Sequence, residues 1–231
     1  MELVERIIYM MDEIRIIEVK QGVFEENNKD ADLLREKLKK EHTFLLNLMS
    51  SPGSGKTSAL LALAKKFAGR INWAVMEADI DSAVDAETML QAGVRTIQIH
   101  TGGMCHLDAQ MTSQGIDELG IEDTDLVVLE NVGNLVCPAE FDTGACKNMT
   151  ILSVPEGHDK PLKYPLMYET CDLLVVNKID VMEYFDFDKE KVVEYAKMRN
   201  PEIDIIFVSA KTGEGIDQLA EWILKNVDEM L

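Results

Sequence analysis

The chain has 231 residues, of which 46% are hydrophobic and 28% are charged, and its formal net charge at pH 7 is −19. This length suits one packed α/β domain with a short appendage. The strong negative charge argues against a nucleic-acid ligand, because phosphate backbones are bound by clustered lysine and arginine. No apolar run approaches the roughly 18 residues that cross a bilayer, and the acidic start MELVERIIYMMDE lacks the positive region of a signal peptide. We therefore expect a cytoplasmic protein without membrane insertion.

Residues 1–42 are expected to form a helical N-terminal extension. Apolar residues recur at helical spacing from Val4 to Met11, and Leu34 and Leu38 continue a helical stripe after the polar run EENNKD.

Residues 43–231 are expected to form a single α/β domain. Seven short apolar runs alternate there with helical patterns: FLLNLM, INWAVME, VRTIQI, DLVVLE, MTILSV, DLLVVN and IDIIFVS. Continuous apolar runs indicate strands that are buried on both faces, and strands separated by helices indicate a parallel sheet. The sequence therefore predicts a mostly parallel sheet with helices on both faces.

The segment SSPGSGKTS follows the first apolar run and opens a helix, which is the setting of a phosphate-binding loop. Its glycines let successive backbone amides point into one concavity. Lys56 supplies a charge for the β- and γ-phosphates, and Thr57 supplies a hydroxyl for Mg²⁺. One departure from the G-x-x-x-x-G-K-[ST] pattern is Ser50, where the first glycine is expected. The nucleotide-binding residues predicted here are Gly53, Ser54, Gly55, Lys56, Thr57 and Ser58.

The motif NKID at 177–180 follows a buried strand and predicts a guanine base. The Asp180 carboxylate can accept both N1–H and N2–H₂ of guanine, a pair that adenine does not offer. Asn177 can reach the base edge or neighbouring loops, and the stem of Lys178 can cover the ring. The later motif SAKTGEG predicts a second base loop, and GTP is favoured over ATP. The residues of that loop are Ser209, Ala210 and Lys211.

The segment DLVVLENVGN resembles the D-x-x-G loop of G proteins, with glutamate in place of aspartate. We expect Glu130 to hold a water on Mg²⁺ and the Gly133 amide to approach the γ-phosphate. The segment EADIDSAVDAE offers Asp79 for Mg²⁺ or the attacking water, then Asp85, whereas Asp81 is expected to be a solvated loop carboxylate. The predicted catalytic residues are Lys56, Asp79 and Glu130, and the predicted Mg²⁺ ligands are Thr57, Asp79 and Glu130.

Cys105 and His106 follow a Gly-Gly turn, and Cys137 lies seven residues after Glu130. Two thiolates and one imidazole form a soft ligand set for Zn²⁺, Ni²⁺ or Cu⁺. Three ligands leave one coordination position open, which suits metal transfer. The alternative is that the cysteines are small buried apolar residues, because a Cys-His pair without C-x-x-C spacing is not by itself a metal motif.

The remaining soft side chains have weaker patterns. In a chain without a secretory signal, thiols for metal or redox work are favoured over disulfides. Cys146 and Cys171 are expected to be core or inert surface residues, and His100 and His158 are possible auxiliary ligands.

The segments SSPGSGKT, TGGMCHLDA, ENVGNLVCPAEFD, EGHDKPLKYP and VVNKID follow the order of one family. From about residue 17 to its end, the chain resembles the hydrogenase nickel-incorporation GTPases, called HypB. The resemblance implies a SIMIBI-type P-loop G domain that hydrolyses GTP with Mg²⁺ and helps load Ni²⁺ into [NiFe]-hydrogenase large-subunit precursors, together with a HypA-type zinc metallochaperone. It also implies a Ni²⁺ or Zn²⁺ site at Cys105, His106 and Cys137, near the interface of a nucleotide- or metal-dependent homodimer. We expect Lys163 to reach toward the nucleotide of the partner subunit.

Two features depart from that family's pattern. No Cys and no His precedes His42, where some members carry a nickel-binding tract, so tight nickel storage in the extension is not expected. Ala78 stands where many members have glycine before the aspartate.

Three other functions remain open. The first is a maturation GTPase for urease or a cobalamin enzyme, and the second is a metal reservoir or sensor that uses GTP structurally. The third, a small-molecule P-loop kinase, leaves the N-K-x-D motif unexplained.

Overall fold

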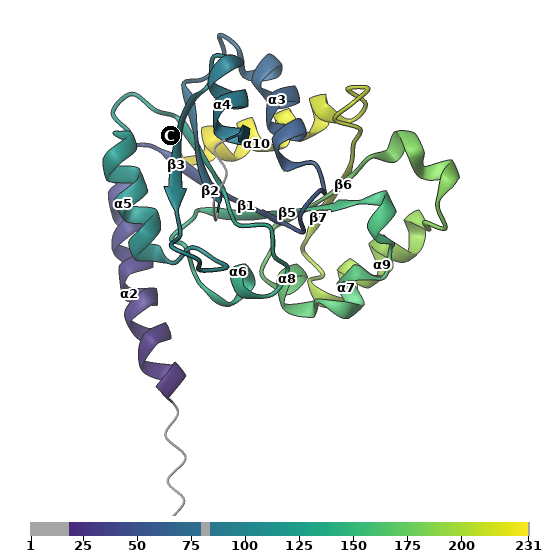
Figure 1. The fold of residues 1–231 in the computed structure, drawn as a ribbon, viewed down its shortest axis with the longest axis horizontal. Helices are drawn as coiled ribbons and strands as arrows, with labels where there is room; N and C mark the ends of the chain where they lie inside the picture. The colour runs from purple at the N-terminus through teal and green to yellow at the C-terminus, as the bar shows by residue number, and fades with distance from the viewer. Residues whose placement is uncertain (1–18, 80–83, 231) are drawn as a thin grey trace, which may run out of the picture.

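The computed structural model describes residues 19–79 and 84–230, and their side chains from 23 to 78 and from 86 to 230. A seven-stranded sheet with the order β3-β2-β4-β1-β5-β6-β7 forms its centre (Figure 1). Each of the six neighbouring strand pairs is parallel. The strands are β1 Phe44–Ser50, β2 Trp73–Asp79, β3 Arg95–His100, β4 Leu126–Glu130, β5 Lys147–Ser153, β6 Leu173–Asn177 and β7 Asp204–Phe207.

All seven predicted apolar runs form strands, so the predicted parallel α/β fold is confirmed. The reason is visible in the burial of the central strands. Every residue of β1, β4 and β6 is buried, which favours apolar side chains on both faces of the sheet; the buried polar exceptions include Glu130 and Asn177 at the carboxyl ends. The edge strand β3 is partly exposed, and its polar residues fit that position.

Helices cover both faces of the sheet (Figure 1). Helices α3, α4 and α10 lie on one face, and α2, α5 and α6 to α9 lie on the other. No helix within the described ranges has both the length and the apolar composition to span a membrane. The helices are α2 Val19–Lys40, α3 Lys56–Phe67, α4 Val84–Gln91, α5 Ala109–Leu119, α6 Cys137–Glu140, α7 Lys160–Lys163, α8 Pro165–Glu169, α9 Lys189–Arg199 and α10 Ile216–Met230, with 3₁₀ turns η1 Val154–Glu156 and η2 Ile179–Tyr184.

The two layers of the core follow from the alternation of side chains along each strand. Leu46 of β1 packs in the cluster that contains Leu60 of α3 and Ile223 of α10. Its neighbour Leu45 faces the other way and packs in the cluster that contains Ile116 of α5. One strand therefore holds both helical layers.

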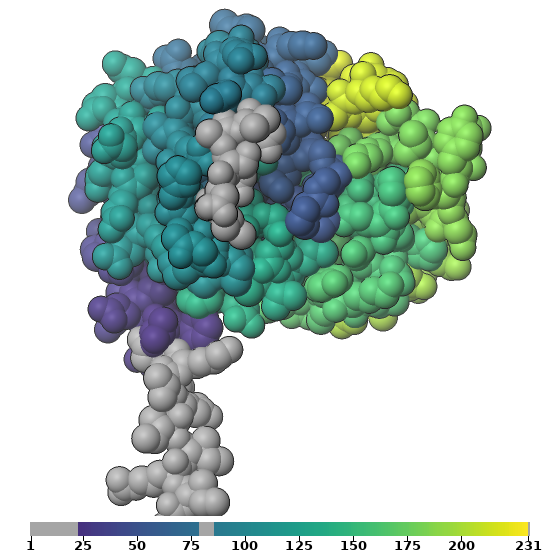
Figure 2. Space-filling model, viewed as in Figure 1, coloured from purple at the N-terminus to yellow at the C-terminus, as the bar shows by residue number. Residues whose placement is uncertain are grey.

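Helix α2 runs without interruption through the polar run EENNKD at 25–30. It lies beside α5, and the space-filling view shows it against that side of the molecule (Figures 1 and 2). Its buried residues include Leu34 and Leu38, as the stripe predicts. The predicted stripe from Val4 to Met11 lies outside the described residues, and the domain boundary at residue 42 stays a prediction.

Candidate functional site

The phosphate-loop residues 51–55 connect β1 to α3 at the centre of the sheet. Because all strands are parallel, the carboxyl ends of β4, β1, β5 and β6 meet at this edge, where α/β proteins bind ligands. Gly53 has φ +74° and Gly55 has φ +99°, which only glycine adopts readily. A Cβ on Gly55 would lie 2.5 Å from Nδ2 of Asn177, so the loop also needs glycine for close packing.

Ser50, the departure from the glycine pattern, is buried inside the loop's own hydrogen-bond network. Its hydroxyl accepts from Ser54 Oγ at 2.7 Å and from Lys56 Nζ at 3.2 Å, and it donates to the Ser51 carbonyl at 2.8 Å. The Ser51 hydroxyl pairs with Glu156 of η1, which ties the loop to the end of β5. The serine therefore supports the loop instead of disrupting it.

Three residues predicted to act on the phosphates and Mg²⁺ meet at this edge. Glu130, buried at the end of β4, has its Oε1 3.5 Å from Thr57 Oγ1 and 4.0 Å from Lys56 Nζ. Gly133 lies against the loop, since a Cβ added there would be 3.1–3.3 Å from three Pro52 atoms. The backbone of the segment that follows β4 thus contacts the phosphate loop directly.

Of the predicted acids after β2, only the backbone of Asp79 and Asp85 is described, and Asp81 lies outside the described residues. Glu77 is a further buried acid at this edge that no sequence motif marks. This residue of β2 is 4% exposed and is the register partner of Glu130 in β4. The two carboxylates therefore stand side by side on neighbouring strands. Sequence spacing alone does not show this, because the β2–β4 pairing is tertiary.

A pocket of about 220 Å³ forms beside the phosphate loop. Seven of its eight lining residues are predicted nucleotide-binding residues; the eighth, Val181, adds an apolar wall that the sequence analysis missed. The lining residues are Gly55, Ser58, Asn177, Lys178, Asp180, Val181, Ala210 and Lys211. The pocket brings the N-K-x-D and S-A-K motifs together, and its position fits a nucleotide base.

Asn177 holds three loops together. Its Oδ1 accepts from the amides of Lys178 at 2.8 Å and Ala210 at 3.1 Å, and its Nδ2 donates to the Ser54 carbonyl at 3.0 Å. Of the two roles predicted for Asn177, the structure therefore shows contacts to neighbouring loops. Lys178, at φ +65°, donates from Nζ to the Gly53 carbonyl at 2.7 Å.

Asp180 faces the same pocket with an oriented carboxylate. Ser209 Oγ donates to Oδ1 at 2.7 Å, and Lys211 Nζ lies 4.0 Å from Oδ2. The side chain of Asp180 is 15% exposed, so the carboxylate is partly shielded from solvent. This arrangement suits an acceptor for a base edge.

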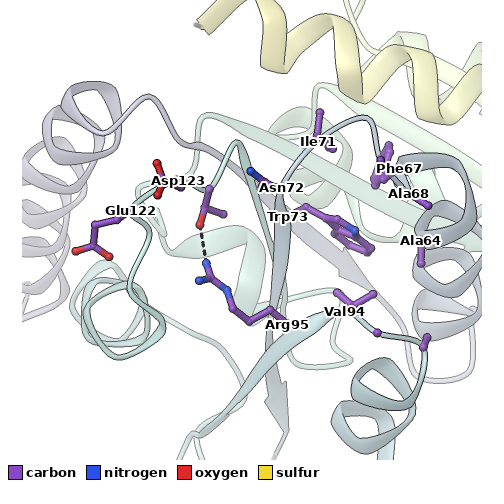
Figure 3. A pocket seen from close by; sticks show the side chains of 14 residues that line it. Ala64, Phe67, Ala68, Ile71, Asn72, Trp73, Val94, Arg95, Glu122 and Asp123 are labelled. Carbon is purple, nitrogen blue, oxygen red and sulfur yellow. Dashed lines mark hydrogen bonds between the residues drawn. The ribbon is translucent and has the colours of Figure 1, made fainter.

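A larger pocket of about 540 Å³ lies elsewhere, at the amino ends of β2 and β3 (Figure 3). Trp73 packs edge-on against Phe67 on one side, and Arg95 donates to Thr124 Oγ1 at 2.5 Å on the other. None of its lining residues is a predicted site residue. The smaller pocket is therefore the candidate base site.

The predicted metal ligands come from two segments, the Cys105 arm (residues 101–109) and the Cys137 arm (residues 137–145). The sulfurs of Cys105 and Cys137 lie 2.8 Å apart, and His106 Nδ1 lies 3.9 Å from the Cys105 sulfur. Asn134 Nδ2 contacts the Cys105 carbonyl at 3.4 Å. The fold thus assembles a thiol pair although β2 separates the strands that precede the two arms.

The electrostatics favour the metal-binding form of the imidazole but the protonated form of the Cys105 thiol, whose proton a metal ion would displace. The hydrogen bond with Cys137 raises the pKa of the Cys105 thiol, and burial lowers the pKa of His106. A lowered pKa favours the neutral imidazole, which is the form that binds metals. Sulfurs on one tetrahedral ion, at 2.3 Å from it, stand roughly 3.8 Å apart, so the pair would open by about 1 Å.

The third predicted ligand, His106, does not complete a three-ligand site with the two thiols. The His106 ring stacks on Phe141, with centroids 3.9 Å apart and planes at 16°. Among the described His, Cys, Asp and Glu side chains, no group of three is close enough to hold a metal ion. The set of Cys105, His106 and Cys137 therefore stays a prediction, supported by the thiol pair and the adjacent imidazole.

The structure also places the other cysteines and histidines named as possible ligands, and Lys163. Burial raises the pKa of Cys171, and it also raises the pKa of Cys146, whose sulfur accepts from the Leu45 amide at 3.4 Å. His158 Nδ1 accepts from the Asp188 amide at 3.3 Å. His100 is exposed at the end of β3, and Lys163 pairs with Asp159 at 2.6 Å in α7.

Comparisons with known proteins place these features in a family. The family model "CobW/HypB/UreG, nucleotide-binding domain" matches residues 43–207. The hydrogenase maturation factor HypB of Escherichia coli K12 is 43% identical over 92% of this chain and 73% of that protein. The hydrogenase/urease maturation factor HypB of Helicobacter pylori J99 is 37% identical over 92% of this chain and 89% of that protein.

A solved structure agrees with both. The crystal structure of HypB from Helicobacter pylori in complex with nickel has a TM-score of 0.84 and 38% identity, over 88% of this chain and 96% of that chain. This chain belongs to the CobW/HypB/UreG nucleotide-binding family and, within it, to the HypB hydrogenase maturation factors.

Proposed function

We propose that this protein is a GTP-hydrolysing metallochaperone that assists the insertion of Ni²⁺ into [NiFe]-hydrogenase large-subunit precursors. One observation carries the proposal. A single short segment leads from Glu130, which contacts Thr57 of the phosphate loop, to Cys137 of the thiol pair. A change at the γ-phosphate would thus reach a metal ligand through seven residues of chain.

In the nucleotide half, the chain's own residues bind and orient GTP. Lys56 and the loop amides hold the phosphates, and Asp180 accepts from the guanine edge. Glu130 and Asp79 orient the attacking water, and Thr57 and both acids would hold Mg²⁺. When bound, Mg²⁺ neutralises charge that develops on the β- and γ-phosphates. Glu77, beside Glu130, contributes a second buried carboxylate to this edge.

In the metal half, the cargo ion would bind to Cys105, His106 and Cys137. Two thiolates and an imidazole suit Ni²⁺ and Zn²⁺ and leave a position through which the ion can pass to a recipient. Exposed apolar side chains of Met104 and Val136 flank the thiols. They support docking at this surface, either of a second copy in a homodimer or of a HypA-type zinc metallochaperone. Lys163, exposed in α7, is proposed to reach the partner's nucleotide in such a dimer.

A cytoplasmic location fits a protein that receives nickel and uses GTP. The Helicobacter pylori relative is a hydrogenase/urease maturation factor, which favours urease as a second client class. The thiol pair favours a hydrogenase client. Tests with purified hydrogenase and urease precursors would separate the two client classes.

One experiment tests the proposal as a whole. GTP turnover and Ni²⁺ affinity are measured for the wild type, Glu130→Gln and Cys137→Ser. We expect Glu130→Gln to slow hydrolysis more than it weakens GTP binding, and Cys137→Ser to weaken Ni²⁺ binding while turnover persists. Absence of turnover in the wild type with Mg²⁺ and Ni²⁺ would support a reservoir that uses GTP structurally.

A further inference from the structure

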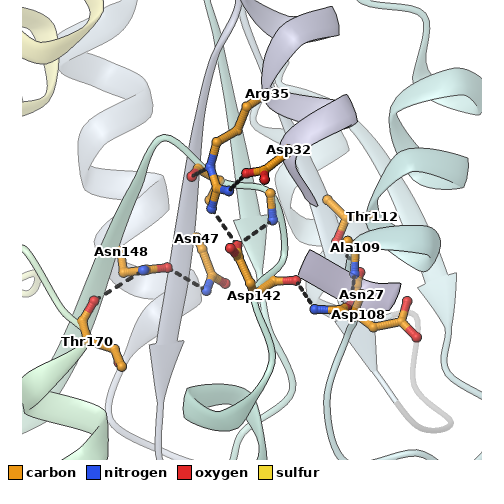
Figure 4. Close-up of polar contacts among 12 residues, drawn as sticks. Asn27, Asp32, Arg35, Asn47, Asp108, Ala109, Thr112, Asp142, Asn148 and Thr170 are labelled. Atoms are coloured by element: carbon orange, nitrogen blue, oxygen red, sulfur yellow. Dashed lines mark hydrogen bonds and ion pairs between the residues drawn. The ribbon is translucent and has the colours of Figure 1, made fainter. Parts of the chain in front are cut away.

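Helix α2 contacts both arms of the thiol pair. Oδ1 of Asn27 accepts from the Ala109 amide at 2.9 Å, and Nδ2 of the same side chain donates to the Asp142 carbonyl at 2.9 Å (Figure 4). Ala109 ends the Cys105 arm, and Asp142 lies in the Cys137 arm. One amide group, on a residue that is 8% exposed, therefore joins the two arms.

The position of Asn27 is unusual for its residue type. Asparagine is a poor residue in the middle of a helix, because its amide competes for backbone partners. Here both amide atoms are used outside the helix. Ala109 is the first residue of α5, whose amide has no partner within its own helix, so Asn27 supplies one. The next residue, Asn28, is exposed and offers a natural comparison.

A second contact connects the same three elements. Phe141 of the Cys137 arm stacks on the His106 ring of the Cys105 arm, with centroids 3.9 Å apart. Its other neighbour is Phe24 of α2, with centroids 5.1 Å apart. The plane of the imidazole is thus set by a ring that α2 supports.

The Cys137 arm is anchored to α2 by further bonds. The Arg35 guanidinium pairs with Asp142 at 2.5 Å and donates to the Ala145 carbonyl at 3.1 Å. Gly144, at φ +76°, leaves only 2.8 Å between an added Cβ and Leu34. Because this arm is fixed to α2, the Asn27 bond to Ala109 fixes the Cys105 arm relative to it.

We propose that Asn27 is a positioning residue of the nickel site, one that sets the separation of the two thiols and the imidazole from a helix outside the family-matched domain. This inference rests on the proposed function, in which Cys105, His106 and Cys137 bind the cargo ion. Residues that orient metal ligands from outside the coordination sphere commonly change metal affinity tenfold or more when replaced.

The test compares substitutions at Asn27 and Asn28 in the full chain. Asn27→Ala removes both bonds, and Asn27→Asp keeps the acceptor for Ala109 but loses the donor for Asp142. Ni²⁺ alone is titrated, and the thiolate-to-nickel charge-transfer absorption is recorded. We expect both Asn27 variants to bind Ni²⁺ about tenfold more weakly with altered charge-transfer bands. Asn28→Ala and Asn28→Asp should match the wild type, and GDP affinity should be unchanged in all four variants.

Wild-type Ni²⁺ affinity and bands in Asn27→Ala would overturn the proposal. Cys137→Ser separates this from failure of the nickel site: unchanged Ni²⁺ binding in that variant would remove the site itself, and the role of Asn27 with it. If Asn27→Ala does not fold, as judged by GDP binding, the more conservative Asn27→Asp carries the test alone, and wild-type Ni²⁺ affinity and bands in that variant would overturn the proposal.

Discussion

Asp180 is the residue on which the choice of base depends. Ser209 occupies one side of its carboxylate and orients the rest toward the pocket. We expect Asp180→Asn to weaken GDP binding by roughly tenfold or more, since losing a charged hydrogen-bond acceptor costs about 1.5–3 kcal/mol. The amide should favour xanthine nucleotides, whose edge offers an acceptor in place of the N2 amine. Calorimetry with both nucleotides measures this, with the exposed Asp186→Asn as the control; equal GDP affinities would refute the guanine assignment.

The cysteines differ in their access to reagents. Cys105 and Cys137 are half-buried, whereas Cys171 is 1% exposed and burial raises its pKa. A raised pKa leaves less thiolate at any pH below it, and the thiolate is the reactive form. The pKa of Cys105 is also raised, so access to solvent decides the order. We expect a thiol reagent at pH 8 to modify Cys105 and Cys137 first, and Cys171 only after unfolding. Mass spectrometry of the labelled protein, with and without denaturant, checks the order; labelling of native Cys171 at the rate of Cys137 would contradict it.

The same shift has a consequence for stability. Because the pKa of Cys171 is raised in the folded protein, the folded state favours the protonated thiol. The free energy of unfolding is therefore not lowered by Cys171 below the ordinary thiol pKa. It falls as pH rises above that value, because the thiol then ionises more readily in the unfolded chain. This loss adds to any other alkaline effect.

Of the two glycines in the phosphate loop, Gly55 is the one whose replacement should disturb the loop more. Gly55→Ala combines a positive φ with a Cβ only 2.5 Å from the Asn177 amide, which joins the loop to the base pocket. We expect it to lower GDP affinity at least tenfold. Gly69→Ala, also at positive φ but with nothing within 4 Å, should cost about 1–2 kcal/mol of unfolding free energy and leave GDP affinity intact. Thermal melts and GDP titrations of both variants test this, and similar GDP affinities would show that the clash is relieved elsewhere.

Elements whose signal is local could be predicted from the sequence. The strands carry short apolar runs, which are continuous in the centre of the sheet and interrupted by polar residues in the edge strand β3. The phosphate loop is marked by its glycines, and the NKID motif by its place after a buried strand. Features that depend on distant partners could not. The continuity of α2 through residues 25–30 rests partly on Asn27, whose partners lie 82 and 115 residues away. Glu77 requires the β2–β4 register, and Val181 requires the folded pocket.

The thiol pair lies between these cases. Residue types and spacing suggested Cys105 and Cys137 as ligands, and the structure brings their sulfurs to 2.8 Å. The orientation of His106 was beyond sequence reasoning, because it is set by stacking on Phe141.

For the whole molecule, the central prediction is that nucleotide and nickel affinities are coupled. If a GTP analogue changes Ni²⁺ affinity by some factor, Ni²⁺ must change the affinity for that analogue by the same factor. We expect a difference of about 1–3 kcal/mol between the GDP and GTP-analogue states, which is the ordinary range of such coupling. Ni²⁺ titrations with each nucleotide measure it.

Two variants locate the path of this coupling. Cys137→Ala should erase the difference between nucleotide states while GTP binding persists, because the Cys137 segment connects to Glu130. Cys105→Ala should weaken Ni²⁺ binding in both states. Coincident wild-type isotherms would show that the two sites are neighbours without communication.

The order of synthesis along the chain also determines when helix α2 can dock on its partners. Asn27 and Asp142 are 115 residues apart in the chain, and ribosomes add roughly 5–20 residues per second, so α2 waits on the order of ten seconds for the arms it joins. Helices in proteins take most of their stability from tertiary packing. During that interval Leu34 and Leu38 lack their final neighbours. Half of the 22 residues of α2 are charged. This charge keeps the waiting segment in water, and a helix that is synthesised early docks on both arms only after residue 142 has been made.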